Sequence, residues 1–269
     1  MEFNNNTIRP AVMLYVKNEK KGEEKYGHIN TWNVSNVTDM SMMFKHAESF
    51  NQHINNWDGG NVTNMYGIFV DAASFNQPLN NWNVSNVTDM RGMFYCAKSF
   101  NQPLDNWDVS NVINMFYMFG FAKLFNKPLN NWNVSKVTNM LGMFCFVELF
   151  NQPLNNWNVS NVTNMKLMFE KASSFNQPLN HWNVSNATDM YSMFNSTTIG
   201  EMLEKHHLTN ENYFDKKVYH ELFVWPRKKE YIMFLVNNQY LPFNKHQEKH
   251  EYHPLFDNPD MSKYIACYL

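Results

Sequence analysis

The chain has 269 residues, and its 44% of apolar and 16% of aromatic residues are enough to bury a sizeable core. A formal net charge of −2 gives no broad attraction for phosphate backbones or anionic lipid, so we expect no nucleic-acid partner. No apolar run approaches the ~20 residues of a spanning helix, and the N-terminus lacks the basic and apolar regions of a secretory signal. We therefore expect no membrane insertion and favour an intracellular site, with surface exposure left open.

The first predicted element is a short capped helix over residues 7–17. Tyr26 and Gly27 then lead into the first repeat, where Ile29 takes the position that leucine holds in later copies. We expect residues 1–28 to form an N-terminal helical cap.

A 25-residue repeat fills the middle of the chain, and self-similarity at such a period is the signature of stacked units. The pattern decays in the seventh copy, where Gly200 and Glu201 stand in place of Phe-Asn. We expect a seven-copy solenoid over residues 29–200, and we number positions by their offset from the repeated tryptophan. The tryptophans are Trp32, Trp57, Trp82, Trp107, Trp132, Trp157 and Trp182.

Each copy predicts one short parallel strand and one helix, an α/β repeat solenoid of the leucine-rich-repeat type. Leu79, Trp82 and Val84 form the strand pattern. The apolar residues from Val87 to Ala97 recur at helical spacing, and Asn101-Gln102-Pro103 reads as the turn toward the next strand. We expect the methionines at offsets 8 and 11 to fill the core. Asparagine recurs at offset 19, and we expect its amides to form a ladder, at Asn51, Asn76, Asn101, Asn126, Asn151 and Asn176.

Residues 201–269 predict a C-terminal helical cap or small domain, with helices over 228–241 and 259–269. His246, His250 and His253 would align on a helix, but Pro254 and charged neighbours favour a loop, so we expect no metal. We expect the three cysteines, Cys96, Cys145 and Cys267, to be reduced.

The repeat string from Trp82 to Met90, followed by Met93-Phe94 and by Ser99 to Leu104, resembles the BspA-like leucine-rich-repeat surface proteins, known also as a mycoplasma lipoprotein repeat. The resemblance covers residues 29–200 and departs from the pattern at Gly59-Gly60, Ile113, Lys136 and Ala187. It implies adhesion or protein binding and transfers no catalytic residue. The caps look more like protist or giant-virus versions, which would place a viral protein in the host cytoplasm.

Function is best sought at offsets that vary between coils, because the framework positions carry the fold. These are offsets 9, 10, 13, 14, 16 and 17, and helical geometry turns most of them toward solvent. In the fourth and fifth coils most of them are apolar, which predicts a partner-binding patch, although burial under the C-terminal segment or simple drift would also explain it. The predicted residues are Phe116, Tyr117, Phe121, Leu124, Leu141, Phe146 and Leu149.

Two other functions stay open beside a protein-binding scaffold. The polar strand face could bind a glycan or protein as an adhesin, or its repeated amides could be ladders, at Asn56, Asp58, Asn81, Asn83, Asp108, Asn131, Asn133, Asn156, Asn158 and Asn183. The C-terminal segment could carry an adaptor activity. The chain has no phosphate loop, nucleophile elbow or metalloprotease motif, so we expect neither an enzyme nor a cofactor.

Overall fold

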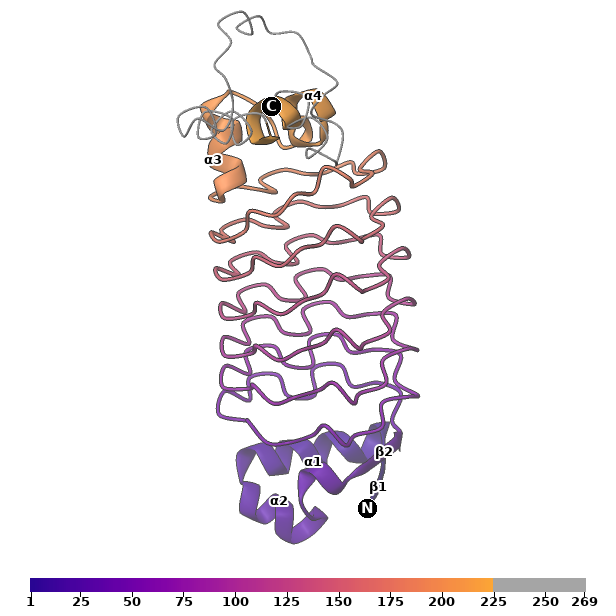
Figure 1. Cartoon of the computed structure of the whole chain (residues 1–269). Helices are drawn as coiled ribbons and strands as arrows, with labels where there is room; N and C mark the ends of the chain where they lie inside the picture. The colour runs from indigo at the N-terminus through magenta and orange to yellow at the C-terminus, as the bar shows by residue number, and fades with distance from the viewer. Residues whose placement is uncertain (225–269) are drawn as a thin grey trace, which may run out of the picture. The chain divides into compact units, whose positions relative to one another are not determined.

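The structure, a computed structural model, describes residues 1–224. A compact unit, Met1–Asp215, holds all seven repeats, which stack as successive coils (Figure 1). A second unit begins at Lys216, and its described part consists of α4 (Lys216–Tyr219) and a π-helical turn, η3 (His220–Val224). The helices expected at 228–241 and 259–269 and the three histidines His246, His250 and His253 lie outside the described residues.

The N-terminal elements are β1 (Glu2–Asn4), α1 (Asn5–Lys17) and α2 (Glu19–Tyr26). The predicted helix is present but begins two residues earlier, because the side chain of Asn4 accepts the N–H groups of Asn6 and Thr7 and so caps it. A 3-10 turn, η1 (Ile29–Thr31), follows, and β2 (Asn33–Asn36) then pairs in parallel with β1.

The predicted helix in each coil is wrong. Between β2 and α3 (Thr198–Lys205) the described chain holds neither an α-helix nor a strand, but a series of turns. Single parallel bridges join successive coils at offset 7, from Asp39–Asn64 through to Asn164–Asp189. The coils are therefore linked to one another through the segment where the sequence predicted a self-contained helix.

Two sets of backbone hydrogen bonds alternate along this segment. At offsets 8, 10, 12 and 14 the N–H groups donate to the next coil, as Phe94 N does to Met118 O at 2.8 Å. At offsets 11, 13 and 15 they donate three residues back within the coil, as Ala97 N does to Phe94 O at 3.0 Å. Because the N–H groups at seven of the eight offsets from 8 to 15 find a carbonyl this way, this segment needs no regular helix or sheet.

The left-handed backbone at offsets 10 and 14 explains why a helix cannot form. Every described copy has a positive φ at both offsets, for example 55° at Gly92 and 58° at Cys96. Each left-handed residue reverses the direction in which the chain curves. Two successive side chains therefore point into the core, and the next two point toward solvent. This four-residue alternation matches the helical spacing of Val87, Met90, Phe94 and Ala97 closely enough to imitate it.

The predicted strand is also absent from every coil except the first, where β2 occupies it. Its side chains nevertheless point as expected, because Trp82 and Val84 are buried. Instead, the indole N–H of each later tryptophan donates a hydrogen bond to a carbonyl oxygen of the preceding coil. Trp107 Nε1, for example, donates to Leu79 O of the preceding coil at 2.9 Å.

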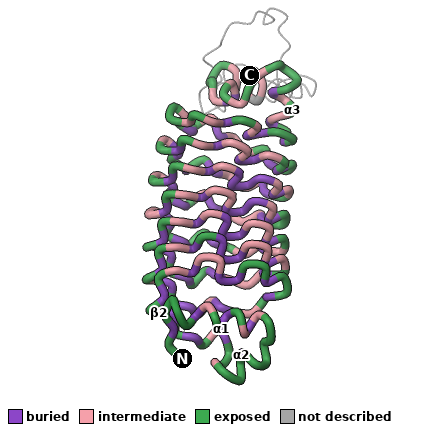
Figure 2. The backbone as a smooth tube through the Cα atoms, turned by 180° about the vertical axis from the view of Figure 1, so that it is seen from behind, coloured by how far each residue is buried: buried purple, intermediate pink, exposed green. Residues whose placement is uncertain are grey.

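Columns of identical side chains fill the interior of the stack. Figure 2 shows buried residues recurring along each coil. Phe94 and Phe119, both at offset 12, stack with centroids 5.5 Å apart, and Phe100 and Phe125, at offset 18, stack at 6.0 Å. The methionines at offsets 8 and 11 are buried among them, which confirms them as core. Each coil thus adds one layer to several continuous columns.

The predicted asparagine ladder is confirmed. The side-chain oxygens of five of the six offset-19 asparagines, Asn51 to Asn151, accept the backbone N–H of their counterparts in the next coil, as in Asn101 N to Asn76 Oδ1 at 2.9 Å. The glutamine at offset 20 adds a second donor, because Gln102 Nε2 lies 3.0 Å from the same oxygen. Lys127 replaces this glutamine in the fourth coil.

Replacing Asn76 with alanine is expected to lower the free energy of unfolding by about 1 to 2 kcal/mol, because it leaves two donors in the next coil without their acceptor. Asn101→Ala is the matched variant, since Asn101 Oδ1 accepts only the N–H of Asn126. We expect it to cost about half as much, which urea unfolding of both variants would measure. An equal loss of unfolding free energy in the two variants would show that the bond from Gln102 to Asn76 does not stabilise the stack.

At the other end of the first unit, α3 and a 3-10 turn, η2 (Glu211–Phe214), follow the seventh coil. Tyr213 is buried against Phe194, with ring centroids 5.0 Å apart. Its hydroxyl lies 3.2 Å from Leu179 N and 3.3 Å from Gln177 O. This side chain covers the end of the phenylalanine column.

Candidate binding surface on coils four and five

The seven residues predicted to bind a partner lie on the outward side of the turn segment in two adjacent coils. We call them the coil 4–5 patch. Leu124 and Leu149 are exposed, at 47% and 48%. The other five are half-buried: Phe116, Tyr117, Phe121, Leu141 and Phe146.

Two glycines make room for Tyr117. A Cβ added at Gly142 would stand 2.5 Å from the Tyr117 ring, and one added at Gly120 would stand 2.6 Å from it. The ring therefore lies directly against backbone, where any larger residue would displace it. Burial raises the pKa of the Tyr117 hydroxyl to about 12.

Phe121 and Phe146 form the second fixed element of the patch. Their rings stack with centroids 4.5 Å apart, and Tyr95 meets Phe121 edge-on at 5.4 Å. Lys171 Nζ lies 4.5 Å from the centroid of Phe146, within range of a cation–π interaction. Because aromatic neighbours hold both rings, their positions are set before any partner arrives.

Charged residues of both signs border the patch. Lys123 Nζ lies 2.8 Å from Glu148 Oε1, and both side chains are about half exposed. Such a pair contributes little to stability in water. It leaves the margin of the patch polar, as the rim of a protein interface commonly is.

Sequence reasoning missed one member of this surface. Tyr95, in the third coil, contacts Tyr117 edge-on at 5.7 Å. In the same coil as Tyr117, isoleucine replaces the threonine that the other copies carry at offset 6, and Ile113 is 49% exposed.

Among the polar residues expected to line the strand face, those at offset 1 have a local structural role. At offset 1 the side-chain oxygen accepts an N–H two residues later in its own coil, as Asn83 Oδ1 does from Ser85 N at 3.1 Å. Asp108 does the same for Ser110, and hydrogen bonds from the Ser110 hydroxyl and N–H lower the pKa of its carboxyl. At offset 1 the amides and carboxylates therefore stabilise turns within their own coil, and no ladder between coils forms there.

The two described cysteines, Cys96 and Cys145, are free thiols, the first half-buried and the second buried. Burial is the main cause that raises the pKa of Cys145 to about 12 and that of Cys96 to about 11. The Cys145 thiol donates to Glu170 Oε2 at 3.4 Å, which also favours its protonated form. Both sulfurs are therefore poor nucleophiles near neutral pH.

The free energy of unfolding is expected to fall as pH rises from about 9 toward 12. An unfolded thiol ionises near its ordinary pKa of 9.0, whereas the folded protein keeps Cys145 protonated up to about 12. The stabilisation is therefore complete below pH 9 and is lost above it. Thermal unfolding of wild type and Cys145→Ala at several pH values measures this. An equally steep fall in the variant would show that Cys145 does not contribute.

No group of three histidine, cysteine, aspartate or glutamate side chains in residues 1–224 is arranged to hold a metal ion. In the same part of the chain, no helix is both long and apolar enough to cross a bilayer.

Stacked 25-residue coils around columns of tryptophan and phenylalanine define a solenoid-like repeat protein. A family profile described as "Mycoplasma protein of unknown function, DUF285" matches residues 13–129 and again residues 102–206, which together span more than half of the chain. The chain belongs to this family. No curated protein and no solved structure matches it.

Proposed function

We propose that the chain is a non-catalytic scaffold that binds a partner protein through the coil 4–5 patch. The observation that carries the proposal is at offset 17, which is serine in coils one, two, three and six but leucine in coils four and five. Leu124 and Leu149 are about half exposed there, in adjacent coils. Burying such a side chain fully is worth about 1.5 to 3 kcal/mol, which favours a protein interface over open solvent.

The order already present in the patch supports this function. Tyr117 is held by Gly120 and Gly142, and the Phe121–Phe146 stack is held by Tyr95 and Lys171. Aromatic side chains that are already fixed lose little conformational freedom on binding, and such residues dominate binding energy in many interfaces. A partner with an apolar surface and a mixed-charge border would complement it.

The exposed leucines give the sharpest test, because they protrude without holding the core. We expect Leu124→Ser combined with Leu149→Ser to weaken partner binding by about tenfold or more while leaving thermal unfolding nearly unchanged. Tyr191→Ser is the matched control, since Tyr191 is 69% exposed in the seventh coil. Affinity capture from native lysate with wild type and both variants would identify the partner, and titration of the purified partner would measure the loss.

Equal capture by the leucine variant would contradict the proposal. So would a wild-type dimer in solution that the leucine substitutions dissociate, because the patch would then serve self-association. Light scattering of each variant distinguishes that outcome from binding of a different protein.

We further propose kinship with the BspA-like repeat proteins, on the strength of the shared Trp-Asn-Val-Ser-Asn-Val-Thr-Asp-Met string. That kinship supports protein binding or adhesion. Adhesion would require display on a cell or virion surface, whereas the scaffold function is proposed for the cell interior. Antibody labelling of intact and permeabilised cells separates the two, since only an adhesin is labelled without permeabilisation.

A further inference from the structure

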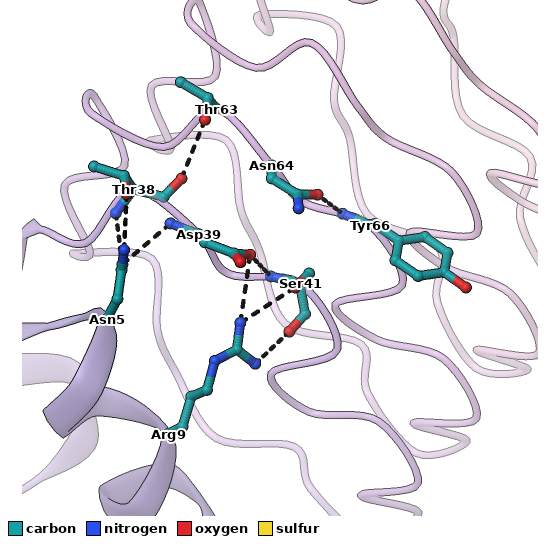
Figure 3. Close-up of polar contacts among 8 residues, drawn as sticks. All are labelled: Asn5, Arg9, Thr38, Asp39, Ser41, Thr63, Asn64 and Tyr66. Carbon is teal, nitrogen blue, oxygen red and sulfur yellow. Dashed lines mark hydrogen bonds and ion pairs between the residues drawn. The ribbon is translucent and has the colours of Figure 1, made fainter.

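The inter-coil hydrogen-bond ladder ends at the first coil, and α1 closes only part of that end. Arg9 of α1 donates to Ser41 O at 2.6 Å and pairs with the Asp39 carboxylate at 3.3 Å (Figure 3). Within residues 1–224, no donor reaches the carbonyl oxygens of Met43 and Lys45. In each later coil the equivalent two oxygens accept N–H groups from the coil before. These two acceptors of the ladder, at offsets 11 and 13 of the first coil, are therefore left open.

A groove lies beside these two oxygens, between the second half of α1 and the edge of the first coil. Its volume is about 250 Å³, and its lining is mainly apolar. This is below the roughly 300 to 1,000 Å³ typical of small-molecule pockets, so one or two side chains fit it better than a whole ligand. Met13 is 71% exposed at the groove, and methionine adapts readily to different apolar shapes. The apolar lining residues are Val12, Met13, Val16, Met43, Phe44 and Ala47.

A lysine stands on each wall of the groove. Lys17 ends α1 and Lys45 belongs to the first coil, and both are exposed. The groove has no acidic lining residue to balance them. Its charge therefore complements a segment that carries carboxylates on both sides of an apolar residue.

We propose that this groove binds an extended acidic segment of a partner protein, adding one strand-like stretch to the open end of the ladder. Two N–H groups of the segment, two residues apart, donate to Met43 O and Lys45 O. They repeat the bonds by which Phe44 N and His46 N donate to the second coil at 2.8 Å. An apolar side chain enters the groove, and flanking carboxylates pair with Lys17 and Lys45. The site is separate from the coil 4–5 patch and does not depend on it.

The test uses the full chain and a fluorescein-labelled peptide of alternating glutamate and leucine, followed by anisotropy. Saturable binding is expected, and methylating the leucine nitrogens, which removes the donors, should weaken it by about tenfold or more. Lys17→Glu combined with Lys45→Glu should weaken it about as much at low salt. Lys98→Glu, an exposed change in the third coil, is the charge control and should have little effect.

Three results would overturn the proposal. The first is no binding of the peptide up to about 1 mM, the limit of weak association. The second is equal affinity of the N-methylated peptide, which would show that the N–H groups of the peptide do not bond to the carbonyl oxygens of the first coil. The third is an equal loss on Lys98→Glu, which would show attraction to charge anywhere on the surface. Tryptophan fluorescence of each variant checks that the fold is kept.

Discussion

Replacing Phe119 with alanine is expected to lower the free energy of unfolding by about 3 to 5 kcal/mol, the largest effect of any single change considered. Phe119 is fully buried in the middle coil. Its ring stacks on Phe94 at 5.5 Å, Phe144 at 5.7 Å and Phe125 at 4.1 Å. The substitution therefore opens a cavity in a column that joins the first three coils to the last three.

Because a solenoid is stabilised by contacts between neighbouring repeats, this cavity should also reduce cooperativity. We expect urea unfolding of Phe119→Ala to be broader than that of wild type or to divide into two steps. Phe116→Ala is the control in the same coil, since Phe116 is only half-buried and should cost less than about 1.5 kcal/mol. Similar costs for the two variants would contradict the assigned core.

The second large loss of unfolding free energy is expected when Gly142 is replaced with alanine. Alanine there must adopt a φ of 59° and would place its Cβ 2.5 Å from the Tyr117 ring. We expect a loss of about 3 kcal/mol, from backbone strain together with displacement of the ring. Gly92→Ala is the matched variant, because its φ is 55° but the nearest atom to its Cβ is 3.7 Å away. It should cost about 1 kcal/mol, from backbone strain alone.

Repeating Gly142→Ala in a Tyr117→Ser background separates the two causes. The ring is then absent, so the cost of Gly142→Ala should fall to that of Gly92→Ala. Thermal or urea unfolding of the four proteins forms a double-mutant cycle. A coupling energy near zero would contradict the contact between Tyr117 and Gly142.

The period, the core and the asparagine ladder were predictable because each follows from a side-chain type recurring at one offset. Trp107, Met115 and Phe119 are buried as the repeat indicates, and Asn101 bonds its neighbour's backbone. The path of the backbone was not predictable from apolar spacing alone. Residues 87, 90, 94 and 97 face inward both in a helix and in a stack of turns that alternates every four residues.

The signal that separates these alternatives is glycine. Gly67, Gly92 and Gly142 stand at offset 10, in the middle of the predicted helix, where glycine is unfavourable. All three have a positive φ. Recurrent glycine at one offset therefore indicated a left-handed residue, and with it an interrupted helix.

The exposure of the patch residues was predictable only in part. Leu124 and Leu149 protrude as expected. Tyr117 is half-buried instead, because the left-handed turn and the facing Gly142 let its ring lie against the backbone. Tyr95 could not be included from the sequence, since its contact with Tyr117 depends on how the coils are stacked.

The central claim is that the coils are joined by backbone bonds through the segment after each tryptophan. Through-hydrogen-bond scalar couplings, measured by NMR on deuterated protein, identify the carbonyl that accepts each N–H. The structure predicts that Phe94 N–H couples to the carbonyl of Met118 in the next coil. Coupling to the carbonyl of Met90, four residues earlier as in a helix, would contradict it.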